Sequence, residues 1–162
     1  MAFKLRRRRI FPAIFLIAVL VAVAVWYRFE KAHPELLLTG IGAVGGFAYF
    51  LYRQHLDETK LFQDLFVDFN ARYDNLNNDL NKILDGPTDG LLSVVERDKV
   101  YKYFNLCAEE YLFHGAGYID DDVWNAWQKG MATFFSHPRI AALWEIEKKT
   151  DSYYGFFPPA IG

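Results

Sequence analysis

Hydrophobic and polar residues are distributed very unevenly along this chain. Residues 10–27 and 36–52 are two runs without a charged side chain, and a charged bend at 28–35 separates them. At about 1.5 Å per residue, each run has roughly the length that ~30 Å of hydrocarbon requires. A helix that is apolar on every face for so long is unusual in a soluble protein. The pattern predicts an N-terminal transmembrane helical hairpin with spans at about 10–27 and 36–52.

After Gln54 the pattern becomes that of an amphipathic helix. Its apolar positions recur at alternating steps of four and three: Phe62, Phe66, Phe69, Tyr73, Leu76, Leu80 and Ile83. Nothing between the second span and this stripe would break a helix, so the sequence predicts one continuous helix that ends at Asp85-Gly86-Pro87 with a C′ glycine. The stripe suits either a core face or a seam that pairs two subunits.

Three more helices follow from their start signals. Ser93 and Glu96 form a capping box for a helix that runs to about His114, and Gly115 and Gly117 are its stop signal. Asp120 suits the N-cap of the next helix, and Pro138 suits the first turn of the last. The apolar tail, 153–162, is not helical and is expected to pack on the domain or on a neighbour. The predicted fold is all-α, with a transmembrane hairpin at 1–54 and a cytosolic bundle of about four helices at 55–162.

The two regions carry opposite charge. Residues 1–54 contain eight Lys/Arg and two Glu, whereas residues 55–162 contain ten Lys/Arg and eighteen Asp/Glu. Because Lys4 and Arg6–Arg9 directly precede the first span, the positive-inside rule places the N-terminus and the large domain in the cytoplasm, with two passes. The net charge of −8 on the large domain argues against duplex nucleic acid as a partner.

Four glycines fall within the second span. The stretch 40–46 matches the G-x-G-x-x-G pattern, but a dinucleotide site needs a surrounding βαβ unit for which there is no room. Gly42 and Gly46 instead form a small-residue pair at the spacing that lets transmembrane helices approach closely. We expect a packing face there.

No residue constellation predicts catalysis. Cys107, Glu110 and His114 share one helix face, but a zinc site needs three or four ligands and no second His/Cys pair has the usual spacing. The sequence favours a core cysteine, a surface or hydrogen-bonded Glu110 and a His114 cation at the helix end. Helix capping accounts for Asp120–Asp122. We expect no enzyme, no metal and no cofactor.

Binding of an anionic ligand is the remaining chemistry. Aromatic side chains are dense in 55–162, and they stack on bases while a few cations hold phosphates. The candidate ligand-binding residues are Arg139, Lys129, His137, Arg97, Lys102 and Trp127. The helix that begins at Pro138 would also present its unpaired N-terminal N–H groups beside Arg139, where they favour an anion. For any single one of these residues, an aromatic core or an ordinary solvated surface is the favoured interpretation.

Two stretches carry a resemblance, Phe62 to Leu80 (FQDLFVDFNARYDNLNNDL) and Tyr103 to Trp127 (YFNLCAEEYLFHGAGYIDDDVWNAW). Set behind a hairpin in a short chain, they resemble the small membrane effectors attached to type III CRISPR antiviral systems. The resemblance implies a homo-oligomer in the bacterial inner (cytoplasmic) membrane that senses cyclic tetra-adenylate, a cyclic oligoadenylate second messenger, and perturbs the lipid bilayer through its hairpin. The acidic domain departs from what a tetra-anionic ligand prefers. The alternative is a constitutive membrane-anchored scaffold that docks a cytosolic protein partner.

Overall fold

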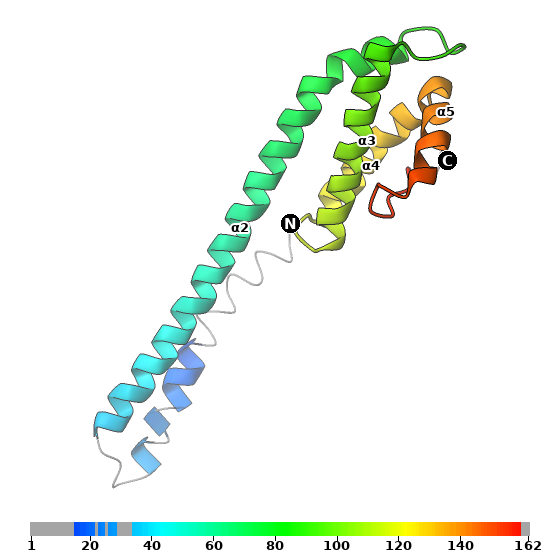
Figure 1. Cartoon of the computed structure of the whole chain (residues 1–162). Helices are drawn as coiled ribbons and strands as arrows, with labels where there is room; N and C mark the ends of the chain where they lie inside the picture. The colour runs from blue at the N-terminus through cyan, green and yellow to red at the C-terminus, as the bar shows by residue number, and fades with distance from the viewer. Residues whose placement is uncertain (1–14, 22, 25, 29–33, 160–162) are drawn as a thin grey trace. The chain divides into compact units, whose positions relative to one another are not determined.

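The computed structural model describes residues 15–21, 23, 24, 26–28 and 34–159. All regular secondary structure in these residues is helical, which confirms the all-α prediction. The elements are α2 (Pro34–Leu84), α3 (Val94–Gly115), α4 (Asp121–Phe135), α5 (Pro138–Glu147) and a short 3₁₀ helix, η1 (Lys148–Thr150) (Figure 1).

The chain divides into two compact units, Met1–Thr59 and Lys60–Gly162. The boundary therefore falls inside α2, a single helix of 51 residues. The sequence placed the division five residues earlier, after Gln54. The prediction that the helix begun in the second apolar run continues to the end of the apolar stripe, Phe62 to Ile83, is confirmed by the bounds of α2.

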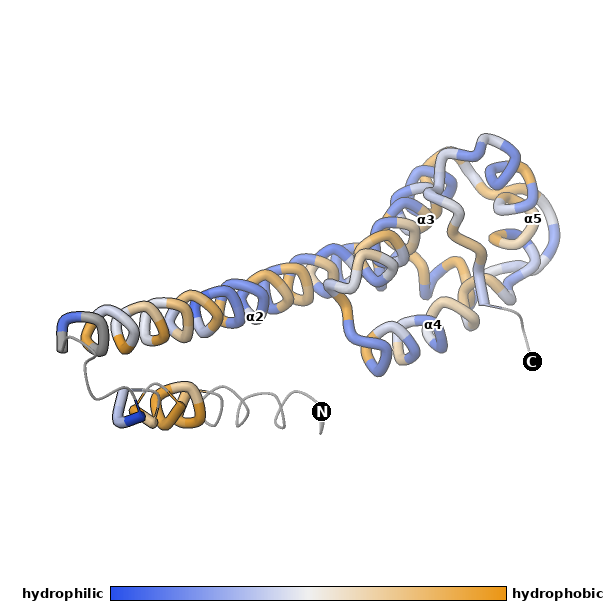
Figure 2. The backbone as a smooth tube through the Cα atoms, turned by 90° about the horizontal axis from the view of Figure 1, so that it is seen from below, coloured by the Kyte–Doolittle hydropathy of each residue, from blue (hydrophilic) through white to orange (hydrophobic). Residues whose placement is uncertain are grey.

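Unit 1 exposes apolar side chains. The predicted span 10–27 lies only partly within the described residues, and those that are described, 15–21, 23, 24 and 26–28, are helical. In the first part of α2, the large apolar side chains are mostly exposed, with Leu38 at 71% and Phe47 at 63%. Figure 2 shows the resulting hydrophobic colouring of this part of the helix. Among the described helices, none combines the length and the hydropathy needed to cross a membrane.

The glycines of the second apolar run are open in this structure. A Cβ atom placed on Gly42 or Gly46 would meet no atom within 4 Å in the described part of the chain. The close helix approach predicted at these glycines is thus not made by the described residues, and their packing role stays a prediction.

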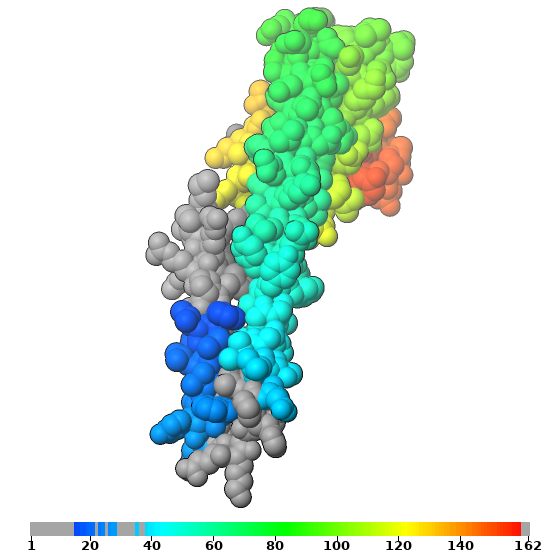
Figure 3. Space-filling view, turned by 90° about the vertical axis from the view of Figure 1, so that its left-hand side faces the viewer, coloured from blue at the N-terminus to red at the C-terminus, as the bar shows by residue number. Residues whose placement is uncertain are grey.

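Unit 2 buries the stripe of α2. Phe69, Leu76, Leu80 and Ile83 are buried in the core, and Phe62 and Tyr73 pack against it. In Figure 3, the C-terminal part of α2 lies in front, with α4 on one side and α3 and the C-terminal tail on the other. The stripe is the core face of unit 2, the first of the two interpretations that the sequence allowed.

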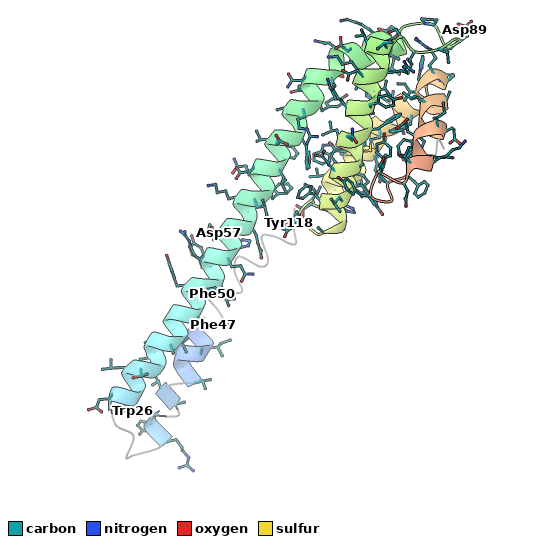
Figure 4. All side chains as sticks on the ribbon, viewed as in Figure 1. Trp26, Phe47, Phe50, Asp57, Asp89 and Tyr118 are labelled. Carbon is teal, nitrogen blue, oxygen red and sulfur yellow. The ribbon has the colours of Figure 1, made fainter. Side chains whose placement is uncertain are left out.

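The predicted start and stop signals explain the other helix ends. Both hydrogen bonds of the Ser93–Glu96 capping box are present, and Pro138 begins α5. At the end of α3, Gly117 has φ +81°, Tyr118 N–H donates to Phe113 O, and Gly117 N–H donates to His114 O. This is a Schellman motif, in which a left-handed glycine closes the last turn. Figure 4 marks Asp89 and Tyr118 in the loops at the two ends of α3.

Two helix ends differ in detail from the prediction. Gly86 follows α2 as expected, but its φ is not positive. A Cβ there would approach Lys82 O and Ile83 O at 3.2 and 3.3 Å, so the site tolerates little beyond hydrogen. Asp120 occupies the N-cap of α4, but its side chain makes no capping hydrogen bond.

Aromatic rings fill the core of unit 2. Phe104 is fully buried and contacts Phe135, Trp144 and Tyr153, with ring centroids 5.2, 5.1 and 6.2 Å away. Tyr153 and Phe156 come from the non-helical tail, and both are buried. The described part of the tail therefore packs on its own domain, which was one of the two predicted positions, the other being a neighbouring molecule.

Candidate functional site

Arg139, in the first turn of α5, is one of two predicted ligand residues that are buried. Its guanidinium donates hydrogen bonds to the backbone oxygens of Pro87 and Leu91 at 3.4 and 3.1 Å, and to the Glu96 carboxylate at 2.9 Å. Its side chain is only 6% exposed. Arg139 thus ties α5 to the α2–α3 loop and to the first turn of α3, and most of its donors are used within the chain.

Glu96 is the partner that links this arginine to the capping box. Its carboxylate also accepts a hydrogen bond from Ser93 N–H at 2.7 Å. The Ser93 backbone and side chain, and then Arg139, lower the pKa of Glu96 below its usual range. One carboxylate therefore caps α3 and neutralises the buried guanidinium.

His137, two residues before Arg139, is the N-cap of α5 and is buried. Neither ring nitrogen has a hydrogen-bond partner among the described residues, and the same holds for Nε of Arg139. Burial, followed by the charge of Arg139, lowers the pKa of His137, because both disfavour a second positive charge. His137 and Arg139 are thus brought together as predicted, but in a desolvated position.

The other predicted cations lie on helix surfaces. Arg97 and Lys129 are exposed, and Lys102 pairs with Asp98 one helical turn away, at 2.8 Å. The sixth residue, Trp127, stacks on Phe66 with ring centroids 6.0 Å apart and meets Phe69 edge-on. The structure therefore joins His137 with Arg139 at the start of α5 and places Trp127 in a different, internal site.

That internal site is a cavity of about 170 Å³ between α2, α3 and α4 of unit 2. Its lining combines aromatic, polar and small residues: Asn70, Tyr73, Tyr103, Glu110, Ala126, Trp127, Gly130 and Met131. The stripe of α2 brings Tyr73 to the core, while successive turns of α3 supply Tyr103 and Glu110. Trp127 is the one predicted ligand residue in this lining.

Glu110 is the unusual member of the lining, since it is only 6% exposed. Its neighbour Glu109 takes the nearest guanidinium, that of Arg72, at 2.6 Å, and no hydrogen bond joins Glu110 to another described residue. Burial raises its pKa to about 8, the charge of Arg72 opposes this, and Glu109 adds to it. The expectation of a surface or hydrogen-bonded acid at this position is wrong.

The tyrosines of the cavity are also desolvated. Burial raises the pKa values of Tyr103 and Tyr73, and the nearby Cys107 and Glu110 raise them further. Tyr73 donates its hydroxyl proton to Asn77 Oδ1 at 3.1 Å, and Asn70 Nδ2 donates to Phe66 O at 2.6 Å. Both tyrosines therefore stay neutral at physiological pH and present aromatic faces and hydroxyl oxygens.

Cys107, Glu110 and His114 do not converge on a metal. Cys107 is fully buried, and burial keeps its pKa well above its usual range, which disfavours the thiolate that metals bind. His114 Nε2 lies 3.0 Å from Asp121 Oδ1, and its ring stacks on Trp124. In the part of the chain that the structure describes, no group of three His, Cys, Asp or Glu is arranged around a metal position.

Sequence reasoning missed the cavity because three helices contribute to it. The signal that was present is Glu110 itself, which stands one turn from Cys107 on the buried face of α3. An acid on an otherwise apolar helix face indicates a buried polar group. Asn70 and Gly130, by contrast, carried no signal at all. Comparison of the chain with protein-family models, characterised proteins and solved structures finds no match.

Proposed function

We propose that the protein is a membrane-anchored effector in which unit 2 senses a ligand on the cytoplasmic side and α2 passes the change to unit 1. The residues 10–27 and 36–52 then form a two-pass hairpin in the bacterial inner membrane. Support comes from the uncharged sequence of both runs and from the exposed Leu38, Phe47 and Phe50. Such side chains gain free energy when lipid covers them, at about 25 cal/mol per Å².

The single observation that carries this proposal is the continuity of α2. One helix exposes apolar side chains at its start and supplies the core face of unit 2 at its end. A displacement of the Phe69–Ile83 face within the core would therefore move the same backbone that enters the apolar run. A ligand drives such a change only if its affinity differs between two arrangements of the helices.

Cyclic tetra-adenylate is the ligand that the resemblance implies. The exposed Arg97 and Lys129 are the cations with the greatest freedom to meet its phosphates, and Lys102 would have to release Asp98. Arg139 enters this proposal as a positioning residue, because its donors already serve Pro87, Leu91 and Glu96. A ligand between two copies of unit 2 would double the number of these cations.

The test is a titration of the full-length protein in a nonionic detergent with cyclic tetra-adenylate, read by calorimetry. We expect a Kd on the order of micromolar or below and a loss of about tenfold in Arg97→Ala and Lys129→Ala. Linear tetra-adenylate is the matched ligand, and Lys149→Ala, an exposed lysine of η1, is the matched variant. No binding at tens of micromolar would remove cyclic tetra-adenylate from the proposal.

The scaffold alternative is favoured by a different observation. An exposed apolar patch lies just before and within the first turn of α3. It consists of Leu91, Val94 and Val95, and Leu91 is 96% exposed. Apolar residues gathered on a surface are typical of protein docking sites. Replacing Leu91 and Val94 by serine should abolish recovery of a stoichiometric partner from the native host, while ligand titrations stay unchanged. A partner recovered equally well by both proteins would exclude this surface.

A further inference from the structure

The cavity between α2, α3 and α4 holds an acid that has no hydrogen-bond or ion-pair partner among the described residues. Glu110 is more than nine-tenths buried and lines the cavity, while the guanidinium whose charge acts on it among the described residues, that of Arg72, is paired with Glu109 at 2.6 Å and with Asp68 at 3.5 Å. No lining residue is cationic. A carboxylate inside a protein is costly unless it is paired, so this position favours either a proton or a positive charge from outside the chain.

The rest of the lining suits the same kind of ligand. Tyr73, Tyr103 and Trp127 surround the cavity with aromatic rings, whose faces attract cations. Acceptor atoms remain in the lining, because Tyr73 uses its proton on Asn77 and Asn70 uses one N–H of Nδ2 on Phe66 O, which leaves the Tyr73 hydroxyl oxygen, Asn70 Oδ1 and the Glu110 carboxylate. Carboxylate, amide and hydroxyl oxygens together accept N–H hydrogen bonds.

We propose that this cavity binds a small organic ammonium ion, with the charged nitrogen on Glu110 and the alkyl part against the aromatic rings and Met131. The oxygen acceptors favour a primary ammonium over a quaternary one, since only the primary ion carries N–H donors. A cavity of roughly 150 Å³ holds a benzene molecule. At about 170 Å³, this one takes a ligand of similar size.

The titration of Glu110 gives the binding a pH signature. The groups that face it are Arg72 and Tyr73 of α2 and Tyr103, Cys107 and Glu109 of α3, while the α4 residues of the lining carry no titratable group. The empty site holds its proton up to a pKa of about 8, and an ammonium ion needs the ionised carboxylate. Affinity therefore rises with pH up to that value, and binding at neutral pH releases a proton.

The experiment uses n-butylammonium as the probe, 1-butanol as its neutral isostere and tetramethylammonium as the quaternary ion. The full-length protein in a nonionic detergent is titrated by calorimetry at pH 6 and pH 8. We expect butylammonium to bind at pH 8 with a Kd on the order of 0.1–1 mM and about fiftyfold more weakly at pH 6, because the ionised fraction of a carboxyl with a pKa of about 8 falls by about that factor. Butanol and tetramethylammonium should bind at least about tenfold more weakly than the probe at pH 8.

Two variants separate this site from general changes in stability. Glu110→Gln should lower the affinity about tenfold, whereas Glu145→Gln, an exposed acid of α5, should leave it unchanged. Gly130→Leu fills the cavity from α4, and since a Cβ at Gly130 meets no atom within 4 Å, the fold should tolerate it while binding is lost. Butanol binding as tightly as butylammonium, tighter binding at pH 6, or full affinity in the Gly130 variant would each overturn the proposal. So would the absence of any butylammonium binding at millimolar concentration at pH 8.

Discussion

The two ends of α2 differ in the solvent exposure of the same residue types. Between 36 and 52 the helix exposes leucine and phenylalanine side chains, whereas between 69 and 83 it buries them under α3 and α4. Both ends are apolar, so hydropathy alone does not separate them. What separates them is the polar residues between the apolar ones. The stretch 69–83 has Asp, Asn and Lys between its apolar residues, and the stretch 36–52 has none of them.

The largest test of this contrast is a pair of phenylalanines. Phe104 is fully buried and Phe47 is 63% exposed. Phe104→Ala should lower the free energy of unfolding by about 4 kcal/mol, because it removes three ring contacts and leaves a cavity. Phe47→Ala should change it by less than about 0.5 kcal/mol. Urea unfolding of the full-length protein in detergent, followed by tryptophan fluorescence, measures both.

In a membrane-binding assay the order of the effects should be reversed, so that the exposed phenylalanines matter more than Phe104. In liposome flotation, replacing both Phe47 and Phe50 by serine should reduce the bound fraction, and Phe104→Ala should not, provided that it is assayed below its unfolding midpoint. Equal flotation of both variants would remove the exposed face of α2 as a lipid contact.

Glu110 gives the next largest effect, through pH. Its pKa in the folded protein, about 8, lies above its ordinary value of 4.5, so the folded state holds a proton that the unfolded state releases. Stability is therefore greatest below about pH 4.5 for this group, falls as pH rises to about 8, and then levels off. The loss between pH 5 and pH 8 should be about 3 kcal/mol.

Glu110→Gln should flatten this slope, and Glu145→Gln should keep it. Urea midpoints measured at several pH values between 5 and 8 provide the comparison. A wild-type midpoint that does not fall across this range would mean that Glu110 reaches solvent or a cation in the folded protein.

The hydrogen bonds of Arg139 should contribute somewhat less to the free energy of unfolding. Arg139→Leu removes the arginine donors from two backbone oxygens and from Glu96, which should cost about 2 kcal/mol. The value stays below that of a fully buried pair because Glu96 is partly exposed and keeps its bonds to Ser93. Arg97→Leu, on the exposed side of α3, is the control. An equal loss of unfolding free energy in both variants would contradict the role of Arg139 in holding α5 to the α2–α3 loop.

The capping box should give the smallest effect. Ser93→Ala removes one capping hydrogen bond and should lower the free energy of unfolding by about 1 kcal/mol. Val95→Ala, in the same turn and 70% exposed, should change it by a few tenths of a kcal/mol. Thermal unfolding of the two variants side by side resolves the difference.

Local signals predicted most of the fold. The capping box at Ser93, the proline at 138 and the glycine at 117 act within one helical turn, so a single sequence contains all that is needed to place those helix ends. The stripe from Phe62 to Ile83 likewise predicted a buried face. It did not predict which helices would cover that face.

The candidate site was much less predictable, because its contacts are distant in sequence. Arg139 looked like a surface cation, but its partners Leu91 and Glu96 lie 48 and 43 residues away. Glu110 looked like a surface or hydrogen-bonded acid, because nothing near it in sequence indicates that it shares a cavity lining with Tyr73 and Trp127. Charge and residue type predicted the chemistry of these groups, whereas their burial depends on the packing of three helices.

The stretch from Leu51 to Leu61 lies between the two ends of α2 and has no buried side chain. Its backbone hydrogen bonds are therefore held mainly by the helix on either side. Amide protons in this stretch should exchange with solvent faster than those from Phe69 to Ile83, because opening them exposes no core. Hydrogen–deuterium exchange of the full-length protein should then resolve α2, a single helix, into a slow segment and a fast one that meet near Phe62.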